Sequence, residues 1–457
     1  MRKPLPSLIA ALVVAPALVA PCLPRADDLI QIYDLAVQSD PLLREAEQTL
    51  FATKEKRPQA IAPMLPNVGL TGKANYNDFS SNGRTNVGGT VVSFSQNDRF
   101  STQTGQAKVT QSVYNRANWM TLRQTDTVIA QAEALYRNAQ IDLMVRTTEA
   151  YFNVLTAADA VTVGEANLRA DERQLEQSKQ RFDVGLVAIT DVNNSQAAYD
   201  LSRANLINYQ TALDNAWEAL RVIVGPIRVP LARLGDKLPL APPQPNEVSI
   251  WADSAQRNNF SIIAASDAAA SAKTNIEIQK SGFYPQLNLE AGYDVVRSGA
   301  EIGSNTDTGF VGLTLTVPIY QGGAVVSRTR QAGYNFRAAQ DQLDQTRRKV
   351  DQQVKDAFRG IQSSIEAVKA RQAAVLSTRS NLESTQAGLE VGTRTQVDVL
   401  TAQRQYFQAE FEYLTSRYKY IINGVKLHQA TSTLTREVLA KGNAWLNPAE
   451  KVAPPAY

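Results

Sequence analysis

A nine-residue stretch that occurs twice constrains the fold of this chain more than any other feature of its sequence. Residues 184–192 read VGLVAITDV and residues 391–399 read VGTRTQVDV, an offset of 207 positions. The same offset joins two rows of apolar residues that step by seven: Val154, Val161, Leu168, Leu175 and Phe182, and then Ile361, Val368, Val375, Leu382 and Leu389. A seven-residue apolar step is the seam along which one helix packs on another. The chain is therefore predicted to be an internal duplication of long, packed helices.

The glycine in each copy indicates a sharp turn between two helices. Gly185 and Gly392 stand just after the apolar rows, where glycine supplies the left-handed backbone that a tight turn needs. Thr190 and Asp191 follow near the start of the next helix, and these residue types favour N-capping and the positive end of the helix dipole. We predict two helical hairpins with short tips. No proline occurs between residues 115 and 182, so the first hairpin should begin with a rod of roughly 100 Å.

The rest of the chain divides around these hairpins. Residues 27–224 are predicted to form a first repeat in the order helix, strand, strand, long helix, tip and helix, and residues 248–430 a second repeat in the same order. Six prolines in residues 225–247 indicate an extended connector with little regular structure. Residues 431–457 form the C-terminal tail, which is Pro- and Ala-rich after Glu437 and is expected to be ordered only in part there.

A period of two predicts four short strands in two pairs. Each pair follows a helix, at about residues 28–62 and 248–282, with Asp40-Pro41 as an interruption or a capped restart in the first. The segments between paired strands are rich in Ser, Asn and Gly and are predicted to be loops, at residues 78–101 and 298–309. The strands themselves cover residues 67–76, 106–113, 286–295 and 311–317.

The first 26 residues have the pattern of a secretory signal peptide. A basic start is followed by an apolar run from Leu8 to Ala20 and then by small residues up to Ala26, where we place the cleavage. Cys22 is the only cysteine, so a mature chain without this leader has no disulfide. That chain also has equal numbers of basic and acidic residues, which argues against nucleic acid as a partner. No later run of apolar residues is long enough for a transmembrane helix.

The strands constrain the oligomeric state if they cross a membrane. Nine residues of strand cover roughly 30 Å, which spans a tilted path through a bilayer, and one face of each strand is apolar. Four strands cannot close a barrel, since about eight is the practical minimum, and open edges are not tolerated in lipid. A dimer would supply eight strands with a packed interior, and a trimer twelve around an aqueous bore. The chain is thus predicted to be mainly α with a small β part that only an oligomer completes.

Two other function classes are compatible with parts of this sequence. The seven-residue step is also typical of a solid coiled coil, and the strands are also compatible with a hairpin in a soluble protein. Together, these two readings would describe a periplasmic scaffold or adaptor that does not span the membrane. For an enzyme, the sequence offers only one histidine, His428, and a Gly322-Gly323 pair without the Lys-Ser/Thr of a phosphate loop. We therefore expect no catalysis, no metal and no cofactor.

Several segments resemble the TolC family of outer-membrane efflux and type I secretion channels. They are the two repeated stretches, DLIQIYDLA at 28–36, AYFNVL at 150–155 and VPIYQGG at 317–323. The resemblance implies a homotrimer, with a 12-stranded barrel in the outer membrane and a 12-helix α-barrel through the periplasm. It also implies a passive exit duct for multidrug efflux or type I protein secretion, and two partners: a periplasmic adaptor (membrane fusion) protein and an inner-membrane transporter of the RND, MFS or ABC class.

The same resemblance implies a gate at the tips. Asp191 would bond Arg394 and hold the tips closed, while Asp398 would form a ring of carboxylates in the bore that attracts cations. Two positions depart from the family pattern: Thr401 stands where relatives often carry a second aspartate, and Leu389 replaces a tyrosine of the lock. We therefore expect one acidic ring and a looser closed state.

The tips are also the expected contact for the adaptor. The residues that would meet it are Gly185, Leu186, Val187, Gly392 and Thr393. Simpler roles compete with these assignments. Both glycines can be turn residues only, Asp191 can be a plain helix cap, and Arg394 can be a solvated surface charge.

Overall fold

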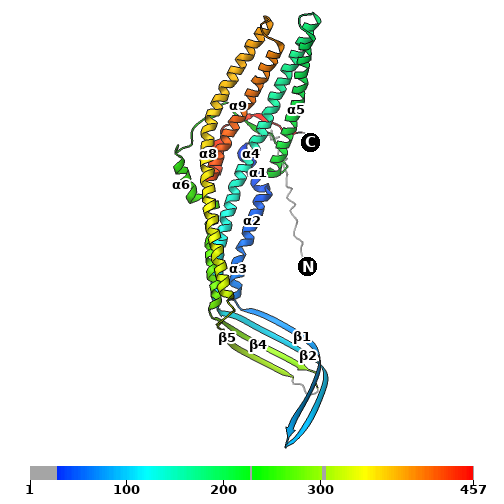
Figure 1. Cartoon of the computed structure of the whole chain (residues 1–457), viewed down its shortest axis with the longest axis vertical. Helices are drawn as coiled ribbons and strands as arrows, with labels where there is room; N and C mark the ends of the chain where they lie inside the picture. The colour runs from blue at the N-terminus through cyan, green and yellow to red at the C-terminus, as the bar shows by residue number, and fades with distance from the viewer. Residues whose placement is uncertain (1–27, 227–228, 301–304, 456–457) are drawn as a thin grey trace, which may run out of the picture.

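The computed structural model describes residues 28–226, 229–300 and 305–455, so the predicted signal peptide, with Cys22, lies outside the described residues. Figure 1 shows an elongated molecule with a β-sheet at one end and two helical tips at the other. The helical part between them accounts for most of the chain, which confirms the mainly α prediction.

Two helical hairpins form the long axis. Hairpin 1 consists of α4 (Arg116–Asp183), with 68 residues, and α5 (Ile189–Val224). Hairpin 2 consists of α8 (Ala324–Glu390), with 67 residues, and α9 (Gln396–Ala430). α4 and α8 run from the sheet to the tips, and α5 and α9 return along them (Figure 1). Among the described residues, no helix combines the length and the hydropathy that a membrane crossing requires.

The N-terminal helix predicted for residues 28–62 is broken into α1 (Leu29–Ser39), α2 (Pro41–Lys54), α3 (Lys56–Ile61) and the 3-10 turn η1 (Ala62–Met64). Asp40 separates the first two because its backbone is extended, and its carboxylate accepts a hydrogen bond from the Leu43 N–H at 2.8 Å. A side chain that satisfies a free N–H of the first turn caps a new helix. The capped restart is therefore the alternative that the structure adopts.

The helix predicted for residues 248–282 is also wrong as a single element. It is divided into α6 (Val248–Asn258), α7 (Phe260–Lys280) and the 3-10 turn η2 (Ser281–Phe283). Asn259 causes the break, since its side-chain oxygen accepts from the N–H groups of Ser261 and Ile262 and starts α7. α7 then packs between α4 and α8, whereas α6 lies on the outside of α8 (Figure 1).

One antiparallel sheet forms the far end of the molecule, in the order β1 (Asn67–Val87), β2 (Thr90–Tyr114), β4 (Gln286–Ser298) and β5 (Thr306–Thr316). The loop predicted for residues 78–101 is wrong, because β1 and β2 stay paired along its whole length up to a turn at Gly88 and Gly89. The loop predicted for residues 298–309 is shorter than expected, since β5 already begins at Thr306. β1 and β5 form the edges, and within the described part of one chain neither has a second partner.

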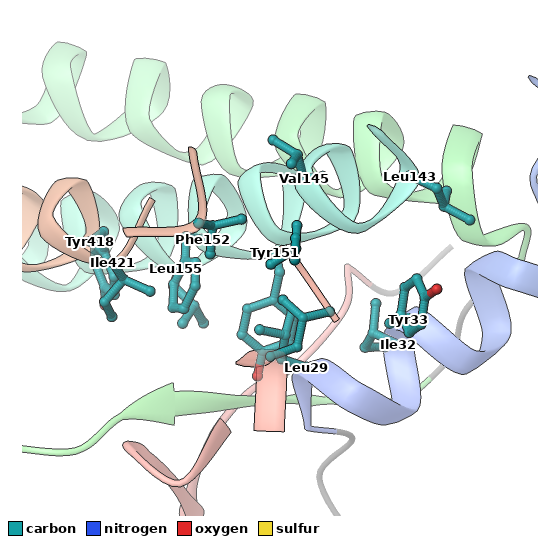
Figure 2. Packing of buried hydrophobic residues seen from close by; sticks show 14 of the residues in the cluster. Leu29, Ile32, Tyr33, Leu143, Val145, Tyr151, Phe152, Leu155, Tyr418 and Ile421 are labelled. Carbon is teal, nitrogen blue, oxygen red and sulfur yellow. The ribbon is translucent and has the colours of Figure 1, made fainter. Parts of the chain in front are cut away.

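The main hydrophobic core lies about halfway along the helices, where α1 and α9 both pack on α4. Figure 2 shows Tyr151 and Phe152 of α4 facing Leu29 of α1 and Tyr418 of α9. The rings of Tyr151 and Phe152 meet edge to face, with centroids 5.5 Å apart. The buried Tyr151 hydroxyl donates to the carbonyl of Ala232 at 2.7 Å, which fixes the connector against the bundle.

The connector and the tail contain more regular structure than predicted. β3 (Leu231–Leu234), in the proline-rich connector, pairs antiparallel with β6 (Leu446–Val452), in the tail. α10 (Arg436–Asn443) precedes β6. β3 is a short regular element in a connector that was expected to have little regular structure, and each of the two strands supplies hydrogen-bond partners for the backbone of the other.

Candidate gate at the helical tips

The first tip, residues 184–188, joins α4 to α5 through a glycine turn. Gly185 has a φ of 76°, in the left-handed region that favours glycine. Its N–H donates to the carbonyl of Phe182 at 2.8 Å, and the Leu186 N–H donates to the carbonyl of Arg181 at 2.8 Å. This pair of bonds is the Schellman motif, which satisfies the last carbonyls of a helix.

The second tip, residues 391–395, repeats that geometry. Gly392 has a φ of 78°, and the Thr393 N–H donates to the carbonyl of Gly388 at 2.8 Å. A Cβ added to either turn glycine, Gly185 or Gly392, would meet no atom of the chain within 4 Å. Within one subunit, the positive φ is therefore the only reason that these two positions require glycine. The repeated sequence encodes one turn motif, used twice.

The two returning helices begin differently. Thr395 caps α9 through a capping box: its hydroxyl accepts from the Asp398 N–H at 3.2 Å, and the Asp398 carboxylate accepts from the Thr395 N–H at 2.9 Å. The backbone N–H and the hydroxyl of Thr395 lower the pKa of Asp398 because they stabilise its charged form.

In the first tip the equivalent cap is missing. α5 begins at Ile189 after Ala188, whose methyl group cannot accept a capping hydrogen bond, so the predicted capping by Thr190 and Asp191 is wrong. Asp191 instead lies in the first turn of α5, where the helix dipole favours a negative charge. Among the described residues, its carboxylate has no hydrogen-bond or ion-pair partner. The carboxylate of the first tip is thus free, whereas the one in the second tip is engaged.

The structure of one chain does not bring Asp191 and Arg394 together. Arg394 is exposed beside the second tip and makes no ion pair within the described part of the chain. Its side-chain stem lies over Gly388, since a Cβ on that glycine would come within 2.6 Å of Arg394 Cγ. The sequence did not single out Gly388, although Gly388 is the equivalent of Arg181 at the repeat offset of 207. Leu389 is half-buried and Thr401 is exposed, as are Leu186 and Thr393 of the predicted adaptor contact, while Val187 is half-buried.

A layer of polar side chains lies behind the tips and was also missed. The Gln174 amide of α4 donates to Gln396 Oε1 of α9 at 2.9 Å, and Gln396 Nε2 donates to the Ser195 hydroxyl of α5 at 3.0 Å. Ser178 of α4 shares a hydrogen bond with Ser195 at 3.0 Å. These contacts join the two hairpins within one subunit.

A second layer, which we call the Asp171 layer, consists of Asn167, Asp171, Ser202 and Gln403. The Asp171 carboxylate accepts from the Gln403 amide of α9 at 2.7 Å and from the Ser202 hydroxyl of α5. Asn167 Nδ2 donates to Ser202 Oγ at 2.8 Å. Asp171 is only 5% exposed, and this burial raises the pKa of its carboxyl. The sequence feature that could have predicted this layer is the seven-residue step from Gln396 to Gln403, because it places two amide side chains on the same helix seam.

The family model described as outer membrane efflux protein matches residues 32–226 and 251–433. Outer membrane protein TolC of Escherichia coli (strain K12) is 36% identical over 450 residues, covering 94% of this chain and 88% of that protein. Alkaline protease secretion protein AprF of Pseudomonas aeruginosa is 26% identical over 403 residues, covering 87% and 83%. The solved Campylobacter jejuni CmeC outer membrane channel has the same fold, with a TM-score of 0.75, 14% identity and coverage of 96% and 98%. The chain belongs to the outer membrane efflux protein family.

Proposed function

We propose that three copies of this chain form an outer-membrane exit duct, whose helical tips close it on the periplasmic side. The observation that carries this function is the placement of two unpaired sheet edges at one end of the molecule and two hairpin tips at the other (Figure 1). Unpaired edges in lipid must be closed by neighbouring copies. Three copies of a four-stranded sheet supply twelve strands, enough for a water-filled interior.

The relatives support a conduit that serves other machines. TolC is named as an outer membrane protein and AprF as a secretion protein for an alkaline protease. We infer that this chain likewise works with a periplasmic adaptor and an inner-membrane transporter of the RND, MFS or ABC class. The exposed tip residues, Leu186 and Thr393 among them, offer the adaptor a surface at the end of the molecule that faces away from the sheet.

The gate is proposed to lie between subunits. Within the described residues, Asp191 has no hydrogen-bond or ion-pair partner. Arg394 makes no ion pair there, although its charge helps to lower the pKa of Asp398, and it does not meet Asp191. In a closed ring of tips, the Arg394 of one subunit can therefore pair with the Asp191 of its neighbour, in the charge-assisted geometry that arginine and carboxylate prefer. Asp398 uses Oδ2 for its capping box, which leaves Oδ1 available to a passing cation.

Conductance of the purified trimer in a planar bilayer tests both roles. Arg394→Ser should raise the conductance severalfold because it removes one side of the lock. Arg379→Ser is the matched control, since Arg379 is an exposed arginine of α8 whose partner, Glu383, is on the same helix. If both variants conduct like the wild type, Arg394 has no part in the lock.

Asp398→Asn tests the acidic ring separately. Asparagine keeps an oxygen that can accept from the Thr395 N–H, so the tip keeps its fold while the ring loses its charge. We expect a lower cation-to-anion permeability ratio, read from the reversal potential in a salt gradient. An unchanged ratio would remove Asp398 from selectivity. A chain that stays monomeric in solution without detergent would instead support the periplasmic scaffold.

A further inference from the structure

The ribbon of β1 and β2 continues beyond the ends of β4 and β5 (Figure 1). β2 pairs with β4 only as far as Thr102, whereas β1 and β2 stay paired with each other up to Val87 and Thr90. Residues 78–99 therefore form a two-stranded ribbon that has no third strand within the described part of the chain, and we call it the outer ribbon. In the proposed duct, on which this inference rests, the helices occupy the periplasmic side of the membrane. The outer ribbon then lies outside the cell.

The four-stranded part of the sheet has one apolar face and one polar face. Side chains alternate between the two faces along a strand, and residues that pair directly share a face. The apolar face draws on all four strands, with Leu70, Val109, Leu289 and Leu313. The opposite face includes Lys73, Thr104, Lys108, Glu290 and Thr314. Lys108 Nζ lies 3.0 Å from Glu290 Oε2 there. The apolar face therefore suits lipid, and the polar face suits a water-filled bore.

The lipid side changes its character where the outer ribbon begins. The register between β1 and β2 runs without a shift from Asn67 to Val87, so each face of the sheet continues into the ribbon. On the lipid side, the apolar residues of β1 end at Tyr76, an aromatic residue of the type that borders a membrane. The ribbon residues that follow on this side are polar except for Val91: Asp78, Ser80, Asn82, Arg84, Asn86, Ser93, Ser95, Asn97 and Arg99.

The bore side changes in the opposite direction. Its large apolar residues in the outer ribbon are Phe79, Val87, Val92 and Phe94, and Phe100 precedes them at the base of the ribbon. Ser81, Thr85, Thr90, Gln96 and Asp98 lie between them. The outer ribbon is thus amphipathic, and its apolar side continues the face that lines the bore.

The side on which these apolar residues lie decides what can cover them. A ribbon bent outward over the membrane would turn its polar side to the lipid head groups and leave its apolar side in water. An upright or inward-bent ribbon turns the apolar side toward the axis of the duct, where the same side of two other ribbons also points. Burial of apolar surface favours this second arrangement. Phe79, Val92 and Phe94 are 46%, 46% and 47% exposed in a single chain, so each has area left to bury.

The ring of Phe94 is placed for such a contact. A Cβ on Gly83, the residue opposite Phe94 on β1, would collide with the ring, so the ring lies across the glycine. The glycine therefore keeps the ring on the bore side of the ribbon and leaves the other surface of the ring to a neighbour.

The outer ribbon is also long enough to reach the axis. Residues 78–87 of β1 extend roughly 33 Å at about 3.3 Å per residue. Twelve strands about 4.8 Å apart and tilted by about 40° form a barrel with a radius of roughly 12 Å. Ribbons from three subunits can therefore meet above the mouth of the barrel.

We propose that the outer ribbons of three subunits pack against one another through Phe79, Val92 and Phe94 and cover the outer mouth of the duct. The partner of each apolar side is the same side of the neighbouring copies. The duct then has a second narrow point, at the cell surface, that is independent of the helical tips. Solutes larger than the gaps between the ribbons pass only when the ribbons part.

Disulfide cross-linking in intact cells tests the contact. Phe94→Cys places a thiol on the apolar side, and Ser93→Cys is the matched control, because Ser93 is the adjacent residue on the polar side. The only cysteine of the sequence, Cys22, lies in the predicted leader. With copper–phenanthroline as the oxidant, Phe94→Cys should form disulfide-linked dimers within the trimer, whereas Ser93→Cys should not. Val92→Cys should also cross-link while it keeps both phenylalanines.

Two outcomes of the cross-linking overturn the proposal. If the trimer forms in detergent but Phe94→Cys and Val92→Cys stay unlinked, the apolar sides do not meet. If Ser93→Cys links as fast as they do, the ribbons collide at random and have no packed face. A chain that forms no trimer would instead count against the duct itself, so failure of the duct is distinguished from failure of the ribbon contact.

Thiol labelling from outside the cell tests the cover. Thr104→Cys places a thiol on the bore face, below the outer ribbon. A shortened chain in which Gly-Gly joins Asn77 to Phe100 removes the ribbon, and these two residues pair directly, as Val87 and Thr90 do around the native Gly-Gly turn. A maleimide attached to a long poly(ethylene glycol) should label the shortened chain severalfold faster than the full chain. A small, membrane-impermeant maleimide should label both.

The two reagents together decide the result. If the large maleimide labels both chains at the same rate, the ribbons do not cover the mouth and the proposal is wrong. If the small maleimide labels neither chain, the bore face does not meet water and the duct itself is wrong. The double variant Phe79→Ser and Phe94→Ser keeps the length of the ribbon and should also label faster with the large reagent, so the test does not depend on assembly of the shortened chain.

Discussion

At the scale of single residues, the difference between the two tips has a consequence for the gate. Ala188 and Thr395 occupy equivalent positions in the repeat, and their backbones are nearly the same, with φ and ψ of −82° and 157° against −94° and 161°. Only Thr395 has a hydroxyl, and only the second tip has a capping box. Because Ala188 cannot cap it, α5 begins without a side-chain cap. For the same reason, the carboxylate of Asp191 remains available to a partner outside the subunit.

Ala188→Thr should give α5 a side-chain cap and, at the same time, make the carboxylate of Asp191 unavailable to a neighbouring subunit. The new hydroxyl can complete a capping box with Asp191 and stabilise the start of α5 by about 1 kcal/mol. It also engages the carboxylate that the lock needs, so the conductance of the trimer should rise toward that of Arg394→Ser. Hydrogen exchange at the first turn of α5 should become slower at the same time.

Ala188→Val is the matched control for this prediction, since valine has nearly the shape of threonine without the hydroxyl. It should change neither the conductance nor the exchange rates at the tip by a comparable amount. If both variants raise the conductance equally, the effect is one of shape, and the free carboxylate of Asp191 has no role in closure.

The residues of the tips could be predicted from the sequence only in part. Gly185 and Gly392 were identified correctly as turn residues because a positive φ selects glycine almost alone. The cap of α5 was predicted two to three residues too late, since Thr190 and Asp191 are good capping residues by type and Ala188 is not. The lock stays a prediction, because its two charged groups would meet only across a subunit boundary.

At the scale of elements, the packing of α4 against α5 and α9 has a pH dependence. Burial raises the pKa of Asp171, whereas its bonds from Ser202 and Gln403 and the nearby charge of Arg404 oppose the shift. Between the ordinary pKa of aspartate and this raised value, the folded chain holds a proton that the unfolded chain has lost. Stability from this group is therefore greatest at low pH and decreases as the pH rises through the raised pKa.

Asp171→Asn should remove that part of the pH dependence. Asparagine can accept from Gln403 and donate to Ser202, whose hydroxyl can reverse, so the layer keeps its bonds without a buried charge. Relative to the wild type, the thermal midpoint of the variant should rise by about 2 °C between pH 4 and pH 7. Burial raises the pKa of Asp159 and Glu410 too, so only the difference between the two proteins isolates Asp171. A constant difference across this range would contradict the assignment.

The elements were predictable where one period extends over many residues. The apolar rows that step by seven predicted α4 and α8, because a long seam leaves a regular pattern, and the glycine turns predicted the helices that return from the tips. The outer part of the β1–β2 ribbon, residues 78–101, was missed. Its Ser-, Asn- and Gly-rich sequence resembles a loop, and only the residue-by-residue pairing shows that it is a strand pair. The Asp171 layer was missed because polar residues on a seam interrupt the pattern that identifies the seam.

At the scale of the whole molecule, the two ends of the described chain meet near the middle of the rod. β6 pairs with β3 over the main core, so that the tail covers the connector. Arg436 Nη2 lies 2.7 Å from a carboxylate oxygen of Asp34, and Asn443 Nδ2 donates to Asp28 at 2.8 Å. The tail is thus part of the belt that holds α1 against the hairpins, and no short-range sequence pattern connects segments so far apart in the chain.

A chain that ends after Ala444 should lose the β6 part of this belt, while it keeps the contacts of Arg436 and Asn443. Leu231 and Ala232 are fully buried beneath the pairing of β3 with β6, and Leu446 and Val452 are 9% and 5% exposed. Removing β6 forfeits the burial of two large side chains, at roughly 1.5–3 kcal/mol each, and leaves the backbone of β3 without its partner. The thermal midpoint and the yield of trimer should both fall, as measured by circular dichroism and size-exclusion chromatography in detergent. A chain that ends after Ala453 keeps β6 and should match the full-length protein. If the shorter chain assembles and melts like the full-length protein, the helices alone are sufficient to form the core. β6 would then not be needed for stability, because removing a strand that the core requires must impair assembly.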